Sequence, residues 1–362
     1  MAVIRMKPLN ARDARLAGLA RSVRAAIVVP SLFALALLVT RQPQAAGIAV
    51  FGTFAHLVMV NYDIAGRARC AEAALLTLLG AITVYLGAEA SATVWLSVGG
   101  AVVAGFLTEL LAVTGGRVAV IRTALLLSFM LAVAIPVSTG SVLPYLAGWL
   151  LAGLVAQPAL LLVWVRLQTA DSVEKSEASR ASLRSLIGGA GPVAWIGSAA
   201  GTAMAMGLAV LLTRLLKLDH AFWVVLGVLP VIRARGTSAS RIFWHELAGT
   251  LIGFLGGASL AAIIGGHQLG YWLILPVIVF ASTYASSAVG FVTGQTAFTV
   301  FAVVLFCILT PHQEHVGLAR VENIAIGGTV SLAIGLLRYL GELCAKVAEG
   351  RLFLAVPQPK GE

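Results

Sequence analysis

Apolar stretches of membrane-spanning length recur along almost the whole chain. A bilayer crossing takes about 20 apolar residues, so 12 helices would use roughly 240 residues, which fits within the chain's 362. Only 11% of the residues are charged, which excludes an ordinary soluble domain. The hydrophobic fraction of 59% excludes a disordered chain. We therefore predict an all-α polytopic membrane protein with about 12 transmembrane spans, at about 25–40, 45–61, 71–88, 92–113, 118–138, 141–165, 193–213, 220–232, 243–265, 269–288, 292–310 and 318–339.

One long polar interval, 166–192, divides these stretches into two groups of six. The groups resemble each other: residues 25–41 align with 198–214, and residues 45–54 align with 220–229. A cytoplasmic linker after six spans gives the seventh span the direction of the first, so we predict two parallel repeats. The predicted organisation is a basic N-terminal tail at 1–24, a membrane repeat at 25–165, the linker at 166–192, a second repeat at 193–340 and a tail at 341–362.

The basic residues predict the orientation of these spans. If the N-terminus is cytoplasmic, all but four of the 25 lysines and arginines fall on the cytoplasmic side. This asymmetry is the positive-inside signal of membrane insertion and predicts that both termini are cytoplasmic. It accounts for most of the net charge of +10. A basic cytoplasmic mouth would also attract anionic solutes, and the two interpretations are compatible. The four basic residues outside are Arg41, Arg214, Lys217 and Arg320.

The densest motif is 220–253, HAFWVVLGVLPVIRARGTSASRIFWHELAGTLIG. An aromatic helix ends near Pro230, a basic turn follows, and the next helix carries G-T-x-x-G. Here the chain resembles the fusaric acid resistance family, also called the aromatic acid exporter family, which is related to plant aluminium-activated malate transporters. Glu246 stands where the family pattern has arginine. The matching residues are Phe222, Trp223, Arg233 to Thr237, Arg241, Gly249, Thr250 and Gly253.

The resemblance implies export of small, often aromatic, carboxylates across a bacterial inner membrane. The implied partners are the lipid bilayer, a small anionic solute, a periplasmic adaptor protein and further copies of the chain, with no nucleic acid and no cofactor. An aromatic anion needs a cationic or N–H-rich contact for its carboxylate and an apolar wall for its ring.

Residues of these types supply the candidates for substrate binding or gating. The alternative roles are interfacial anchoring for the aromatic side chains and orientation for the arginines. Arg320 is either an exit-side anion contact or the partner of an acidic group on a neighbouring helix. The candidates are Trp223, Arg233, Arg235, Arg241, His245, Glu246, Thr250, Gln295, Arg320 and Glu322.

Ionisable residues within the apolar stretches are costly to insert and form a second set of candidates. Glu109 and Arg122 flank one turn at similar depth, and we expect either a structural ion pair or a gate. His56 is either a hydrogen-bonded packing residue or a group that titrates near neutral pH. Glu72 and Glu246 begin equivalent helices, as capping residues or as a proton relay. The stripe Gly249, Gly253 and Gly257 favours helix packing over a ligand groove.

No catalytic or metal motif is present in the sequence. The string HELAG begins like H-E-x-x-H, but Gly249 stands where the second histidine would be. Three cysteines, Cys70, Cys307 and Cys344, match no metal-binding spacing. A Walker A sequence is also absent. We therefore expect a secondary transporter and not an enzyme, with a passive anion channel or a membrane scaffold subunit as alternatives.

Overall fold

The computed structural model describes residues 11–59, 66–114, 116–135, 141–162, 192–218, 221–234, 237–310 and 316–348. This part of the chain is all-helical and contains no strand. Each predicted apolar stretch coincides with one helical segment. The helices are α1 (Ala11–Thr40), α2 (Pro43–Phe54), the π-helix η1 (Ala55–Met59), α3 (Gly66–Ala90), α4 (Val94–Thr114), α5 (Gly116–Ala134), α6 (Leu143–Leu162), α8 (Pro192–Leu215), α9 (Phe222–Arg233), α10 (Thr237–Ile264), α11 (Gln268–Ala288), α12 (Phe291–Leu309) and α13 (Val316–Ala348).

Nine helices of the described chain are long and apolar enough to cross a membrane, and three further apolar segments are shorter. The short segments are α2 with η1, α5 and α9. Helix α9 has only 12 residues, which at about 1.5 Å per residue is well below the thickness of a hydrocarbon core. The prediction of an all-α polytopic protein is confirmed.

The surface and the interior have the polarity expected in lipid. Large apolar side chains face outward, including Trp95 at 78% and Ile263 at 82% exposure. Charged groups lie inside instead, with Glu246 and Arg320 each 1% exposed. Soluble proteins rarely bury such groups or expose so much apolar surface. The chain is therefore a multi-pass membrane protein.

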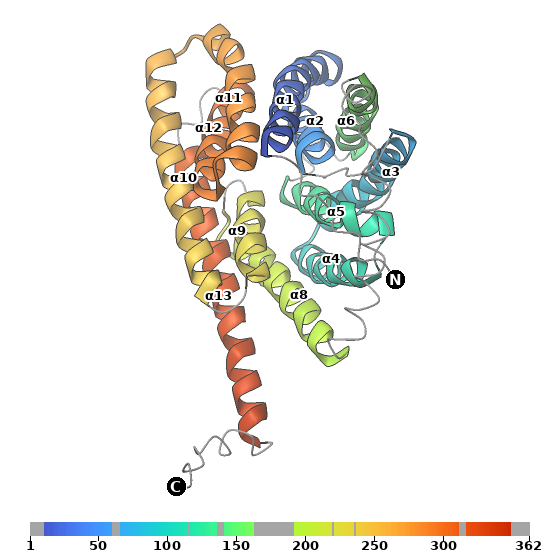
Figure 1. Ribbon diagram of the computed structural model, residues 1–362, viewed down its shortest axis with the longest axis vertical. Coiled ribbons are helices and arrows are strands. Elements are labelled where there is room, and N and C mark those ends of the chain that lie inside the picture. Colours follow the sequence, from blue (N-terminus) through green and yellow to red (C-terminus); the bar gives the residue numbers. More distant parts are fainter. Residues whose placement is uncertain are drawn as a thin grey trace.

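The helices form two groups that meet along two lateral contacts. In Figure 1, α1 to α6 lie on one side of the molecule and α10 to α13 on the other. Helix α4 packs on α8, and α1 packs on α11, so each group is joined twice to the other. Corresponding pairs within the groups also pack together: α3 on α5 as α10 on α12, α2 on α6 as α9 on α13, and α3 on α6 as α10 on α13.

Two helices continue beyond the predicted apolar stretches. Helix α1 begins at Ala11, upstream of the stretch predicted at 25–40. Its first turns are rich in alanine, leucine and arginine, which are good helix formers in water as well as in lipid. Helix α13 continues to Ala348, and its C-terminal part extends away from the other helices in Figure 1.

Short helices in the interior are positioned by local sequence signals. Pro43 occupies the first turn of α2, where its missing N–H costs nothing, and the preceding Gln42 is extended. Helix α2 ends in the π-helix η1, a distortion that shifts backbone hydrogen bonds. Helix α9 is buried along almost its whole length. These two helices therefore bring their side chains to the centre of the molecule.

Candidate functional site

Arg320, near the start of α13, is the centre of a buried polar cluster. The cluster consists of Trp223 on α9, Glu246 and Thr250 on α10, Thr299 on α12 and Arg320 itself. The guanidinium carbon of Arg320 lies 4.2 Å from the centroid of the Trp223 ring. Its Nε donates a 3.0 Å hydrogen bond to Thr299 Oγ1. An arginine desolvated against an aromatic face gains about 2 kcal/mol.

A second ring completes the support of this guanidinium. Phe298, the residue before Thr299 on α12, lies 4.9 Å from the guanidinium carbon of Arg320. Trp223 and Phe298 also pack edge to face, with 6.3 Å between ring centroids. Arg320 therefore sits between two aromatic side chains from different helices, which fixes its position.

Several polar atoms of this cluster have no hydrogen-bond partner. They are Nη1 of Arg320, both carboxylate oxygens of Glu246, Oγ1 of Thr250 and Nε1 of Trp223. The charges of Arg320 and Glu246 interact, but no hydrogen bond joins them. Buried polar groups are nearly always satisfied in native proteins, so unsatisfied groups of this kind mark a place where a ligand, ion or water acts.

Glycines on α10 allow the close helix contact that assembles the cluster. A Cβ atom on Gly253 would lie 2.6 Å from the Cβ of Thr299, the residue that holds Arg320. One turn away on each side, a Cβ on Gly249 or Gly257 would lie 2.9 Å from the Cβ of Gln295 or Val303 on α12. Helix α12 thus packs directly on the backbone of α10, as small-residue stripes permit.

A small aromatic cavity lies beside the cluster, between the two groups of helices. Its volume is about 30 Å³, enough for about one water molecule. Phe51 of α2 contacts both Phe222 and Trp223 of α9, in a tilted and an edge-to-face arrangement, at 5.3 and 5.8 Å between centroids. Rings from both groups of helices therefore meet here. The cavity is lined by Phe51, Phe54, Ala55, Met59, Ala124, Leu127, Ser128, Leu131, Trp149, Phe222, Leu226 and Phe298.

His56 lies on η1, near this cavity, and is fully buried. Its Nδ1 lies 2.7 Å from the carbonyl oxygen of Gly52, to which it must donate. Its Nε2 lies 3.0 Å from Thr77 Oγ1 on α3, and the indole Nε1 of Trp149 donates to the Thr77 carbonyl at 3.0 Å. His56 is thus a hydrogen-bonded packing residue that ties η1 to α3 and satisfies a carbonyl at the π-helix.

Glu109 and Arg122 belong to an electrostatic group at the opposite end of α9 from Phe222. The charge of Arg233, the last residue of α9, interacts with both of them. Arg233 also donates a 3.0 Å hydrogen bond to Thr123 Oγ1, and Thr202 of α8 donates to Glu109 Oε1 at 3.4 Å. The side chains of this end therefore come from both groups of helices.

The remaining predicted residues are scattered. Glu72 is fully buried on α3, whereas Gln295 is half-buried on α12. Arg241, His245 and Glu322 are exposed and do not join the buried polar cluster. Arg235 lies outside the described residues. Within the described residues, no group of three or more His, Cys, Asp or Glu side chains could hold a metal ion.

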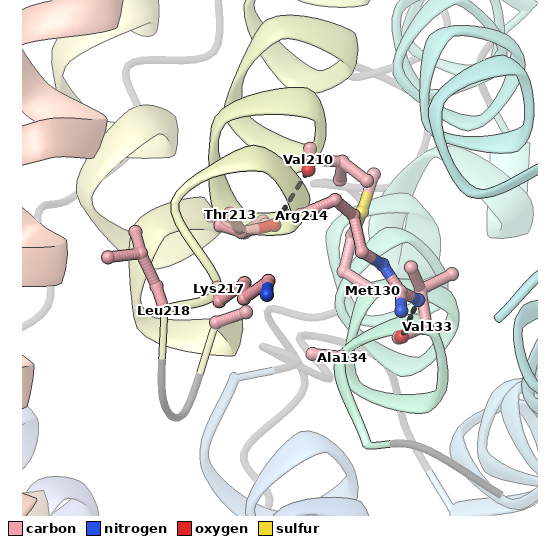
Figure 2. Close-up of a pocket in the computed structure, with 10 residues that line it drawn as sticks. Met130, Val133, Ala134, Val210, Thr213, Arg214, Lys217 and Leu218 are labelled. Carbon is pink, nitrogen blue, oxygen red and sulfur yellow. Dashed lines mark hydrogen bonds between the residues drawn. The ribbon is translucent and has the colours of Figure 1, made fainter. Parts of the chain in front are cut away.

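The sequence prediction did not include a larger cavity at the C-terminal end of α8, which we name the Arg214 pocket. Its volume is about 260 Å³. Figure 2 shows Arg214 reaching from α8 towards Val133 on α5, with Lys217 on the α8 side of the pocket. Arg214 and Lys217 are two of the four basic residues that the positive-inside pattern leaves outside. This exception is the sequence feature that could have indicated the pocket. The pocket is lined by Met130, Val133, Ala134, Val210, Thr213, Arg214, Lys217, Leu218, Ala221 and Val225.

Part of the chain matches a known protein family. Residues 208–334 match the family model described as fusaric acid resistance protein-like. This match confirms the resemblance that the 220–253 motif indicated. The matched segment contains all residues of the buried polar cluster. No curated protein and no solved structure matched the chain.

Proposed function

We propose that this membrane protein, whose residues 208–334 belong to the fusaric acid resistance protein-like family, is a secondary transporter that exports small organic anions. Aromatic carboxylates are the proposed substrates, the proton gradient is the proposed driving force, and the proposed site is the bacterial inner membrane. The observation that carries this proposal is Arg320, a buried cation stacked on Trp223, with Nη1 unpartnered.

The chemistry of the cluster suits an aromatic carboxylate. A guanidinium binds carboxylates through paired N–H groups, and Arg320 retains an unused nitrogen for this purpose. The aromatic cavity beside it offers ring faces from Phe51, Phe222 and Phe298. A substrate ring would pack there by the offset and edge contacts that aromatic side chains already make. The cavity is small, so substrate entry requires the two groups of helices to move apart.

Glu246 is the proposed site of proton coupling. Both of its carboxylate oxygens are buried and unpartnered, and its charge interacts with that of Arg320. A carboxylate near Arg320 competes with an anionic substrate for the same cation. Protonation of Glu246 would remove the competing charge, and this links substrate binding to proton binding.

The proposed architecture is two parallel six-helix repeats with both termini in the cytoplasm. The corresponding helix contacts within the two groups support it, as does the reciprocal pair of contacts α4 on α8 and α1 on α11. A two-fold arrangement puts the shared interface at the aromatic cavity, where transporters built from repeats place their substrate site.

Transport by the purified full-length chain in proteoliposomes tests this function. We expect uptake of radiolabelled phthalate, an aromatic dicarboxylate that crosses lipid slowly, to require a pH gradient. Arg320→Gln should abolish uptake, and Trp223→Phe, which keeps an aromatic ring, should reduce it severalfold. Arg241→Gln removes an exposed arginine and serves as the matched control with unchanged uptake.

The outcomes separate the alternatives. Flux driven by voltage without any pH gradient would indicate a passive anion channel in place of an exporter. Absence of flux for every aromatic and aliphatic carboxylate tested, from protein that elutes as a folded species, would overturn transport and leave the scaffold function.

A further inference from the structure

The Arg214 pocket combines a held cation with an apolar enclosure. Nη2 of Arg214 donates to the carbonyls of Ser91 and Val133, at 3.2 and 3.0 Å, and to Ser97 Oγ at 3.0 Å. These acceptors come from the α3–α4 connection, α4 and the end of α5. The hydrogen bonds of Nη2 therefore connect the guanidinium to several helices and fix its position.

The other two nitrogens of Arg214 are left for a ligand. Within the described residues, neither Nε nor Nη1 makes a hydrogen bond, and the ten residues lining the pocket include no carboxylate. Lys217 adds a second positive charge at the rim, where its backbone takes the left-handed conformation with φ of 51°. Nε and Nη1 lie on opposite sides of the guanidinium, so each offers a separate N–H donor, and Nη1 can donate to an oxygen of a carboxylate or phosphate.

The walls of the pocket define the rest of the ligand. Apart from Arg214, Lys217 and Thr213, every lining residue is apolar. The cavity of about 260 Å³ is slightly below the usual range for drug-sized ligands, so it suits a single ring or a short chain. We propose that the Arg214 pocket binds an amphiphilic anion, with the acidic group on Arg214 and a small apolar body against α5 and α9.

The pocket is separate from the buried polar cluster but shares two helices with the aromatic cavity. At the start of α9, Val225 and the N-cap residue Ala221 line the Arg214 pocket, whereas Phe222 and Leu226 line the cavity. Helix α5 likewise presents Met130 to the pocket and Leu131 to the cavity. An occupant of the pocket therefore packs on the same helix pair that bounds the cavity. The binding proposal rests on the pocket's own geometry and does not depend on transport.

Titration calorimetry with the full-length chain in phosphatidylcholine nanodiscs tests the proposal. Three probes separate charge from apolar body: benzoate has both, benzamide has the ring without the charge, and acetate has the charge without the ring. We expect saturable binding of benzoate, and at least tenfold weaker binding of benzamide and acetate.

Variants locate the site. Arg214→Gln should weaken benzoate binding at least tenfold. Arg41→Gln is the matched control, because Arg41 is an exposed arginine in the equivalent sequence position at the end of α1, and it should leave affinity unchanged within twofold. Because Arg214 also joins several helices, Ala221→Phe provides a second variant, which fills the pocket without removing a charge and should also block binding.

The source of the natural ligand is resolved by repeating the titration in phosphatidylglycerol nanodiscs. Loss of benzoate binding there supports the proposal with a lipid headgroup as the occupant, and retained binding supports it with a soluble anion. Equal benzoate affinity in the wild type, Arg214→Gln and Ala221→Phe would overturn the proposal, as would absence of saturable binding in both lipids. Neither result depends on the phthalate assay, so the pocket and the transport function fail separately.

Discussion

Arg320 and Glu246 interact through their charges but are held very differently. Arg320 has two aromatic rings and a threonine oxygen as neighbours. Glu246 has no hydrogen-bond partner for either oxygen. An unsatisfied buried charge costs several kcal/mol. Only the attraction of Arg320 offsets this cost for Glu246, whereas the ring and threonine contacts of Arg320 offset part of its own burial. This asymmetry predicts that Glu246→Gln and Arg320→Gln have different effects on the stability of the protein.

Glu246→Gln should lower the midpoint of thermal unfolding less than Arg320→Gln, because it loses only the attraction between the two charges and no hydrogen bond. Arg320→Gln should lower the midpoint by several degrees, since it loses the ring contact worth about 2 kcal/mol and the bond to Thr299. Unfolding of the purified proteins in detergent, followed by tryptophan fluorescence, measures both. A Glu246→Gln protein less stable than Arg320→Gln would contradict this account.

The members of the buried polar cluster were partly predictable from the sequence. Trp223 and Thr250 belong to the 220–253 motif, whereas Glu246 and Arg320 stand out because charged residues are rare in such apolar stretches. Their convergence was not predictable, because the packing of α9, α10 and α13 decides which side chains meet. Thr299 is one of several threonines in its helix, and the sequence does not distinguish it from the others as the partner of Arg320. The sequence places Arg214 outside but predicts no site for it, because its acceptors, such as Val133, are backbone carbonyls that any residue supplies.

Packing of α10 on α12 holds Thr299 in place and gives a test of helix association. Gly253→Ala would put a Cβ 2.6 Å from Thr299 Cβ, so the helices must separate, at a cost of about 1–3 kcal/mol. Gly256→Ala is the matched control on the same helix, where the nearest atom is 3.7 Å away. Gly253→Ala should lower the unfolding midpoint, and Gly256→Ala should not. Equal midpoints for the two variants would show that this contact is not tight.

The helices themselves were predictable, and their ends were not. Apolar length is a strong signal, so each predicted stretch coincides with a helix of the structure. The start of α1 at Ala11 lies in a polar, basic segment, where hydropathy gives no signal although helix propensity is high. The π-helix η1 was not predicted, because its stability comes from the contacts of His56 with Gly52 and Thr77. Such contacts depend on tertiary packing and leave no periodic pattern.

Each proposed repeat contains an equivalent helix–helix crossing: α6 crosses α2 in the first, and α13 crosses α9 in the second. A Cβ on Gly148 of α6 would collide with the carbonyl oxygen of Ala45 and lie 3.3 Å from the nitrogen of Ala49, both on α2. A Cβ on Gly327 of α13 would collide with the carbonyl oxygen of Val224 on α9 in the same way. Both glycines therefore allow a helix to lie on the backbone of a short interior helix.

Gly148→Ala and Gly327→Ala should destabilise the protein to a similar extent, because each forces apart an equivalent pair of helices. Gly335→Ala, with nothing within 4 Å of its Cβ, is the control on α13 and should leave the unfolding midpoint unchanged. Thermal unfolding in detergent compares all three. A large effect at one crossing and none at the other would argue against equivalent repeats.

The orientation of the whole molecule depends on whether the short helix α9 crosses the membrane. If it does, Lys217 before α9 and Arg241 after it lie on opposite sides, with Lys217 outside as the charge pattern predicts. If it does not, the two lie on the same side and the 12-span count is wrong. Both side chains are exposed, so each position can be labelled as a single cysteine.

Lys217→Cys and Arg241→Cys, each in a chain with Cys70, Cys307 and Cys344 replaced by alanine, provide this measurement. A membrane-impermeant maleimide should label Lys217→Cys in intact spheroplasts and Arg241→Cys only after lysis. Arg41→Cys, at the end of α1, should behave like Lys217→Cys because a cytoplasmic N-terminus places both outside. Labelling of Lys217→Cys and Arg241→Cys from the same side would show that α9 turns back within the bilayer. The second group of helices would then no longer repeat the orientation of the first.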